Sequence, residues 1–184
     1  MASSAHEPLY FDDVQVGDSW VSLGRTITES DLVNFAGMTG DYDPLHVDHE
    51  FARQTPFGRR IAHGLLGLSL VAGLGSHSPW MQTAAFVRIV EWKFLKPMYI
   101  GDTVRVETEI VEKQRTKARR RGTIVWRRSL LNQAGEVVQT GTTETLVQVR
   151  AAVAPAPRAA TPLLNVGLPP VDAQSPRALG AAGE

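Results

Sequence analysis

The hydrophobic pattern changes its period near residue 85, and this change limits the folds open to the chain. Residues 62–75 form a helical segment that is apolar nearly all round, which predicts a buried helix. After it, apolar and polar residues alternate, which predicts strands separated by short polar turns. The expected strands cover residues 85–95, 103–112, 122–131 and 137–149. Such strands form an antiparallel sheet with one face to bury, and the apolar helix is large enough to cover it. We therefore expect an α+β fold, a long antiparallel sheet wrapped around a buried central helix.

Shorter elements should precede this helix. Residues 20–26 predict a short strand. Thr28 and Asp31 have the spacing of a capping box, so a helix should begin there and be ended by Gly37 and Gly40.

A second short helix is expected over residues 47–53. Asp48 is placed to cap its N-terminus, and Phe51 and Ala52 should face inward.

Composition suggests how the chain is organised. Its 184 residues suit a single domain, which we place at 10–150 after a lead-in of residues 1–9. Residues 151–184 are rich in alanine and proline and predict a low-complexity tail or an extended arm.

Several functional classes are disfavoured by composition. The chain has no cysteine, which excludes disulfides, thiolate catalysis and cysteine-based metal sites. Its formal net charge is zero, so no overall field draws it to nucleic acid or to an anionic membrane. The N-terminus has no signal-peptide pattern, and the apolar run of residues 65–74 is too short to cross a bilayer. We expect a cytoplasmic protein.

Three carboxylates and an imidazole lie within eight residues, at Asp41, Asp43, His46 and Asp48. Asp41 and His46 are five residues apart across a proline-containing loop, so both can face one water molecule. That arrangement suits an acid/base pair. An alternative without catalysis is that Asp41 caps a turn and His46 binds the backbone.

A second cluster lies where the apolar helix should begin. The Gly64 N–H would be one of the unpaired donors at the positive end of the helix dipole, and a glycine lets a carbonyl oxygen approach it. This suits an oxyanion hole, although a glycine needed only for close packing would look the same. His63 fits a supporting hydrogen bond better than proton transfer. His46, His49 and His63 lack the spacing of a metal site, so we expect no metal.

Basic residues gather around residue 120. We expect mainly a solvated hairpin, with contacts to the phosphates of a ligand as the second interpretation and nucleic-acid binding a distant third. The residues are Lys113, Arg115, Lys117, Arg119, Arg120, Arg121, Arg127 and Arg128.

The two clusters together resemble the hydratase motif of the MaoC-like (R)-specific enoyl-CoA hydratases. The family pattern is roughly Gly-Asp-x-Asn-Pro-x-His-x-Asp, followed after a gap by Ala/Val-His-Gly. The chain carries Gly40-Asp41-Tyr42-Asp43-Pro44-Leu45-His46-Val47-Asp48 and then Ala62-His63-Gly64. Further matches lie in order over about residues 10–150. One position departs from the pattern, because the usual asparagine is Asp43, which only accepts hydrogen bonds when ionised.

The resemblance implies a hot dog fold and the reversible hydration of a trans-2-enoyl thioester, an enoyl-CoA, to a 3-hydroxyacyl thioester. Asp41 and His46 would be the acid/base pair of this hydro-lyase, and Gly64 would supply the oxyanion hole. Asp43, His63 and Phe57 would contact the substrate. The resemblance also implies a homodimer and no cofactor. Two other functions are weighed, acyl-CoA thioesterase and a non-catalytic acyl-CoA-binding subunit.

Overall fold

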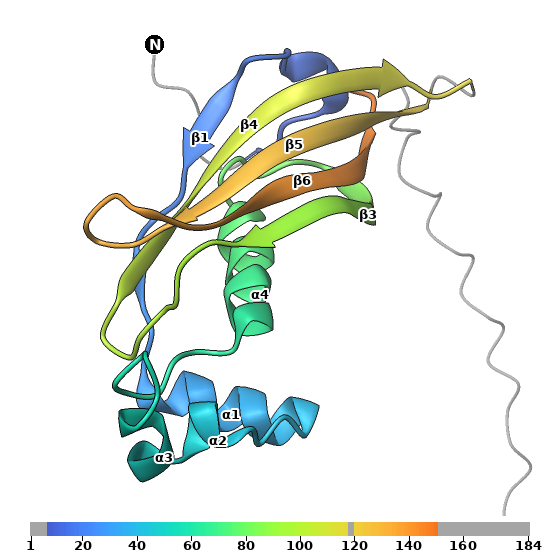
Figure 1. The fold of residues 1–184 in the computed structure, drawn as a ribbon. Helices are drawn as coiled ribbons and strands as arrows, with labels where there is room; N and C mark the ends of the chain where they lie inside the picture. Colours follow the sequence, from blue (N-terminus) through green and yellow to red (C-terminus); the bar gives the residue numbers. More distant parts are fainter. Residues whose placement is uncertain (1–6, 118–119, 151–184) are drawn as a thin grey trace, which may run out of the picture. The chain divides into compact units, whose positions relative to one another are not determined.

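The computed structural model describes residues 7–117 and 120–150, and the predicted tail over 151–184 lies outside them. A six-stranded antiparallel sheet dominates (Figure 1). Its strands are β1 (Ser19–Val21), β2 (Arg25–Thr26), β3 (Thr83–Phe94), β4 (Thr103–Arg115), β5 (Arg121–Leu131) and β6 (Val137–Gln148). The order is β1-β4-β5-β6-β3, and β2 pairs with β4. The four long strands confirm the predicted sheet.

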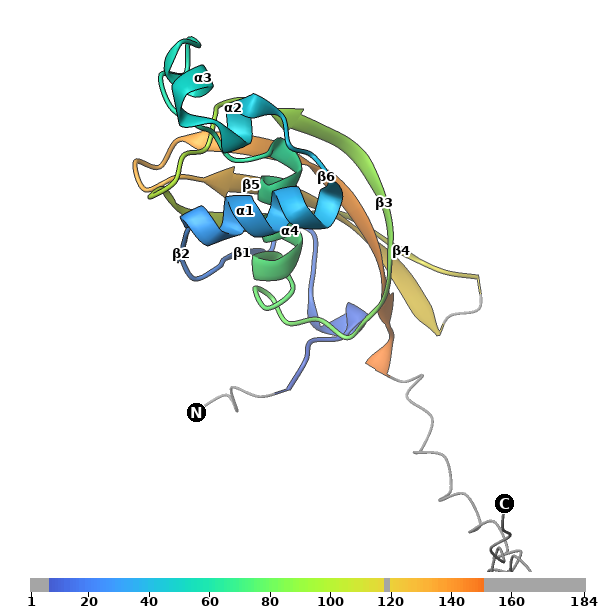
Figure 2. The ribbon, with the colours of Figure 1, turned by 90° about the horizontal axis from the view of Figure 1, so that it is seen from below.

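The helices lie on one side of this sheet (Figure 2). They are η1 (Phe11–Asp13), α1 (Glu29–Thr39), α2 (Pro44–Val47), α3 (His49–Arg53) and α4 (Gly64–Gly75). Helix α4 lies against the sheet, and α1, α2 and α3 gather at the end where α4 begins (Figure 1). No helix among the described residues is long and apolar enough to cross a membrane.

The main core fills the space between α4 and the sheet. Alternate residues of β4, β5 and β6 are buried, as expected for strands with one covered face. On α4, Leu66, Leu70 and Val71 are buried against them. The other side of α4 stays open, since the Leu65 side chain is 59% exposed. The helix is therefore covered along one face only. Its composition had predicted burial nearly all round.

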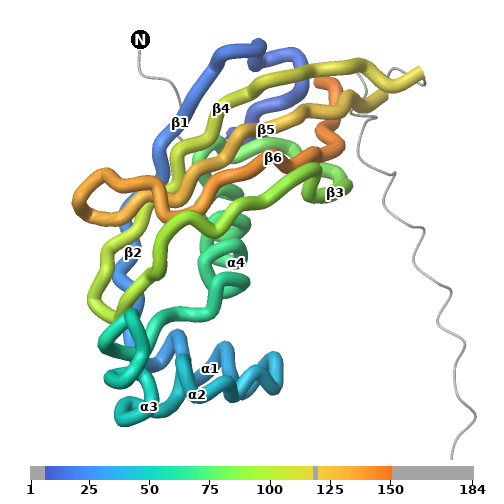
Figure 3. Tube along the Cα trace, in the orientation of Figure 1, coloured from blue at the N-terminus to red at the C-terminus, as the bar shows by residue number. Residues whose placement is uncertain are grey.

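The segments before α4 differ in part from expectation. The single strand predicted over 20–26 is two short strands, β1 and β2, which both pair with β4 (Figure 3). The Thr28–Asp31 capping box is present, so the predicted start of α1 is confirmed. Gly37 lies inside α1, whereas Gly40 ends it with a φ of +76°.

The region predicted as one helix over 47–53 is instead α2 followed by α3. Asp48 caps α3 as predicted, because its carboxylate accepts hydrogen bonds from the Glu50 and Phe51 N–H groups. Ala52 is buried, but Phe51 is 47% exposed, so its inward placement was wrong. A five-residue helix makes little more than one turn, so it can bury only about one of its side chains against the protein, here Ala52.

Candidate active site

Local capping shapes the loop that carries Asp41 and His46. The left-handed Gly40 turns the chain out of α1, and Pro44 takes the first position of α2, where its missing N–H costs nothing. The Asp43 carboxylate caps α2 by accepting the Leu45 N–H at 2.9 Å. His46 therefore lies on a turn of helix whose start is fixed, and Asp41 lies just before it.

This loop is bonded to the segment that leads into α4. The His46 Nδ1 lies 2.8 Å from the Ile61 carbonyl oxygen, and the His63 Nε2 lies 3.0 Å from the Asp41 carbonyl oxygen. The Ile61 N–H donates to the Leu45 carbonyl at 3.3 Å. Each segment thus positions the other, and the two clusters of the sequence form one site.

These contacts determine the histidine tautomers. A carbonyl oxygen only accepts, so His46 must carry a proton on Nδ1, which leaves Nε2 of the neutral ring as a bare base. By the same argument His63 is protonated on Nε2. The two rings stack with centroids 3.8 Å apart, and His63 is 2% exposed. His63 therefore packs behind His46, where it supports the loop.

Arg60 is a further residue that holds the loop. It is 5% exposed, its Nη2 donates to Glu29 Oε1 at 2.6 Å, and its Nη1 donates to the His46 carbonyl at 3.4 Å. The hydrogen bonds from Arg60 hold the pKa of the Glu29 carboxyl below its usual 4.5, because they stabilise the charged form. This role of Arg60 was not predicted, since nothing in the local sequence marks an arginine as buried.

Gly64 begins α4, as predicted. The first hydrogen bonds into the helix come from Leu66 and Gly67 to the His63 carbonyl, so the Gly64 N–H precedes them. A Cβ at Gly64 would lie 3.0 Å from the Phe94 ring, a tight contact, so close packing also favours glycine here. The Gly64 carbonyl accepts from Gln139 Nε2 at 2.9 Å, and Gln139 accepts from the Trp92 indole, which ties the helix start to the sheet.

A pocket of about 280 Å³ opens beside Gly64. Phe57, Phe94 and Met98 supply apolar walls, and the buried Gln139 reaches it from β6. Phe57 is thus near Gly64, where a substrate contact was expected.

Ligand atoms of Asp41, His46 and His63 lie within 4.8 Å of one another. Such a group can serve proton transfer or hold a metal ion. His46 and His63 each use one ring nitrogen on a backbone carbonyl, and the Asp41 side chain is 53% exposed. The three histidines weighed from the sequence were His46, His49 and His63, and no metal site was expected from them.

The basic cluster is only partly a solvated hairpin. Arg115 pairs with Asp12 and Arg127 with Glu109 at the surface, and Lys113 donates to the carbonyl oxygens of Phe11 and Val14. Arg128 is 7% exposed, so its assignment to the solvated group was wrong. Arg119 lies outside the described residues.

A helix held against a long antiparallel sheet is the arrangement of the hot dog fold. Residues 14–128 match the family described as MaoC like domain. The chain belongs to the MaoC-like dehydratase family.

Named relatives agree with this placement. The chain is 36% identical over 142 residues to an (R)-specific enoyl-CoA hydratase of Rhodospirillum rubrum, covering 77% of this chain and 93% of that protein. It is 41% identical over 105 residues to a 3-hydroxybutyryl-CoA dehydratase of Methylorubrum extorquens, covering 56% of this chain. That alignment spans 65% of the Methylorubrum protein, just under two thirds of its length.

A solved structure shows the same fold. The crystal structure of a MaoC-like dehydratase from Rhodospirillum rubrum superposes with a TM-score of 0.68 at 31% identity. The match covers 77% of this chain and 98% of that one.

Proposed function

We propose that the protein hydrates trans-2-enoyl-CoA thioesters reversibly to 3-hydroxyacyl-CoA thioesters, as a hydro-lyase without a cofactor. The observation that carries the proposal is the reciprocal bonding of the Asp41–His46 loop to the segment before Gly64. This bonding ties the loop to the start of α4, which supports assigning Asp41, His46 and the Gly64 N–H to one site. The names of the relatives support the same chemistry.

Three demands of the reaction match these groups. Water must lose a proton as its oxygen attacks C3, and His46 Nε2 with the Asp41 carboxylate can orient and deprotonate one water. The proton held on this pair then returns to C2, which balances the addition. Meanwhile the thioester oxygen gains negative charge, which the Gly64 N–H at the positive end of α4 would stabilise. Phe57 would contact the substrate in the adjoining pocket. Asp43 and His63, for which the resemblance implied substrate contact, would instead support the loop.

The test is an absorbance assay, in which the purified protein is mixed with crotonyl-CoA or with longer enoyl-CoA substrates. Hydration is seen as loss of the enoyl-thioester absorbance. Asp41→Asn and His46→Ala should each lower kcat/KM by about 100- to 10,000-fold, the usual contribution of a general acid or base. Asp48→Asn is the matched control, because asparagine caps a helix as well as aspartate does.

Two results would reject the proposal. If every enoyl-CoA is left unhydrated and free thiol appears instead, the protein is a thioesterase. If it binds acyl-CoA without turnover and Asp41→Asn leaves binding unchanged, it is a non-catalytic subunit.

We also propose that two chains associate through β3. This strand pairs with β6 on one side, and nearly all its residues are exposed. Its exposed apolar side chains are Phe86, Val87, Ile89, Val90 and Phe94. An unpaired apolar edge favours pairing with another strand, and a second copy supplies a matching one. The cytoplasmic location expected from the sequence stays a prediction.

A further inference from the structure

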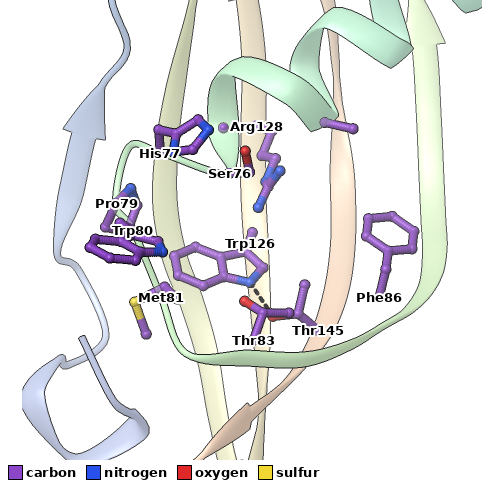
Figure 4. A pocket seen from close by; sticks show the side chains of 12 residues that line it. Ser76, His77, Pro79, Trp80, Met81, Thr83, Phe86, Trp126, Arg128 and Thr145 are labelled. Atoms are coloured by element: carbon purple, nitrogen blue, oxygen red, sulfur yellow. Dashed lines mark hydrogen bonds between the residues drawn. The ribbon is translucent and has the colours of Figure 1, made fainter. Parts of the chain in front are cut away.

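Arg128 points from β5 into a pocket at the far end of α4 from Gly64 (Figure 4). The pocket has a volume of about 370 Å³. Its walls are largely apolar and include Pro79, Trp80, Met81, Phe86 and Trp126. In Figure 4 the guanidinium lies between the Trp126 ring and the end of α4. The Arg128 Nη1 would lie 2.8 Å from a Cβ at position 75, so the glycine there makes room for it.

Arg128 is a buried charge without a counter-charge. It is 7% exposed, and no carboxylate among the described residues pairs with it. Its Nε is buried and makes no hydrogen bond to the described chain. Burial lowers the pKa of Arg128 to about 10, so the group is still charged at neutral pH. Since buried charges are ordinarily paired, this guanidinium is an anomaly that a ligand would resolve.

Neighbouring groups compensate the charge only weakly. The negative end of the α4 dipole and the face of Trp126, whose ring centroid is 5.6 Å from the Arg128 Cζ, favour a cation. His77, which also lines the pocket, is neutral or cationic and supplies no negative charge. The described chain therefore leaves the fork of the guanidinium free for an anion.

A second pocket indicates which kind of group would carry the anion. It has a volume of about 240 Å³, runs along Leu68, Val71 and Ala72 of α4, and shares Ala72, Phe86 and Arg128 with the first pocket. The path to the guanidinium is thus apolar. A carboxylate matches a guanidinium in charge and in its two-pronged geometry, whereas a phosphate dianion would bring excess charge.

We infer that Arg128 binds the terminal carboxylate of an aliphatic chain lying along α4. Arg128 lies against Gly75, which at a rise of 1.5 Å per residue is about 16 Å along α4 from Gly64. A long acyl group whose thioester sits at Gly64 could span that distance and bring its far end to Arg128. The carboxylate can therefore belong to such an acyl group or to a free aliphatic acid. The first source rests on the proposed function, and the second does not.

Direct binding tests the inference without any turnover. Octanoate, suberate and octanol are titrated into the full chain by calorimetry, with thermal melting as a second readout. Octanoate and suberate should bind and octanol should bind at least about tenfold more weakly, since a charge-assisted hydrogen bond is lost. Arg128→Met should lose the preference for the acids, and Arg128→Lys should recover part of it because it restores the charge without the fork.

Arg127→Met is the matched control. Arg127 is the next residue on β5, faces the other side of the sheet and pairs with Glu109 at the surface, so acid binding should be unchanged. Arg128→Met without ligand should melt no lower than wild type, because an unpaired buried charge is removed. Equal binding of octanol and octanoate by the wild type would overturn the inference even if a variant failed to fold. So would undiminished acid binding by Arg128→Met.

Kinetics separate the two sources. Enoyl-CoA substrates of equal length are compared, one ending in a carboxylate and one in a methyl group. A higher kcat/KM for the carboxylated substrate that Arg128→Met abolishes identifies the acyl group as the source. Acid binding without such a preference identifies a free acid. If no enoyl-CoA is hydrated at all, the proposed function fails, while calorimetry still decides the role of Arg128.

Discussion

Asp43 is the residue at which the motif departs from its family, and its position accounts for the change. Its carboxylate caps α2 by accepting the Leu45 N–H, a task that asparagine performs equally well. The substitution therefore keeps the conformation of the loop that carries Asp41 and His46. A negative charge at a helix start is also favourable, although a single-turn helix has only a small dipole.

Substitutions at Asp43 separate capping from substrate contact. Asp43→Asn keeps the cap, so kcat/KM for enoyl-CoA hydration should change less than about threefold. Asp43→Ala removes the cap and should cost about 1 kcal/mol of stability, with a larger fall in activity as the loop loosens. Urea unfolding and hydration kinetics measure both effects. A hundredfold loss in Asp43→Asn would show that the carboxylate contacts the substrate or water directly.

The sequence motif located the acid/base candidates but not the residues that hold them. Asp41, His46 and Gly64 follow from local spacing, because each lies at a turn or helix end that the sequence marks. Arg60 and Gln139 act through partners 31 and 75 residues away, which no local pattern reveals. Arg128 could have been found, since it shares the inward register of Trp126 and Leu130. It was grouped with its charged neighbours instead.

At the scale of elements, long periodic segments were predictable and short ones were not. Each long strand and α4 carries enough alternating or helical pattern to define its type, and the predicted ends lie within a few residues of those observed. The α2–α3 region has only single turns, whose start depends on caps and on Pro44. The division of residues 20–26 into β1 and β2 depends on pairing with β4, about 80 residues later.

The Arg60–Glu29 pair joins α1 to the segment before α4 and predicts a pH dependence. Because the folded pKa of Glu29 is depressed, its contribution to stability is complete above the unfolded value near 4.5 and is lost as pH falls through the lower folded pKa. Glu29→Gln should therefore destabilise the chain at neutral pH, by at most about 1 kcal/mol because the Glu29 side chain is 54% exposed. The difference from wild type should shrink toward pH 3.

Activity should respond to the same substitution. Arg60 also donates to the His46 carbonyl. If Glu29→Gln loosens Arg60, His46 is held less firmly, and kcat for hydration should fall several-fold. Melting curves from pH 3 to 8 and steady-state kinetics measure the two effects. Glu50→Gln is the control, because Glu50 pairs with Arg53 in an exposed contact and not with Arg60. A constant difference in melting temperature across this pH range would contradict the assigned role of Glu29.

At the scale of the whole molecule, the outer edge of β3 and the open side of α4 indicate incomplete burial in a single chain. Phe86, Val87, Ile89 and Val90 are each between 44% and 52% exposed, and Leu65 of α4 is also exposed. Apolar side chains are normally scattered singly on a protein surface, whereas these follow one strand. Association through this edge would cover the strand and extend the sheet, since β3 pairs with β6 alone among the described strands.

Val87→Asp tests this association. A charge on an edge strand is a natural means of blocking strand pairing, and the two-fold symmetry of a dimer would bring both carboxylates to the same interface. Light scattering should give twice the chain mass for the wild type and a single chain mass for Val87→Asp, with hydration reduced if the pocket is completed by the second chain. Leu23→Asp introduces the same charge at an 86% exposed leucine away from β3, so it should leave the mass unchanged. A wild type of single chain mass, or a Val87→Asp variant that stays paired, would show that the apolar edge of β3 does not hold two chains together.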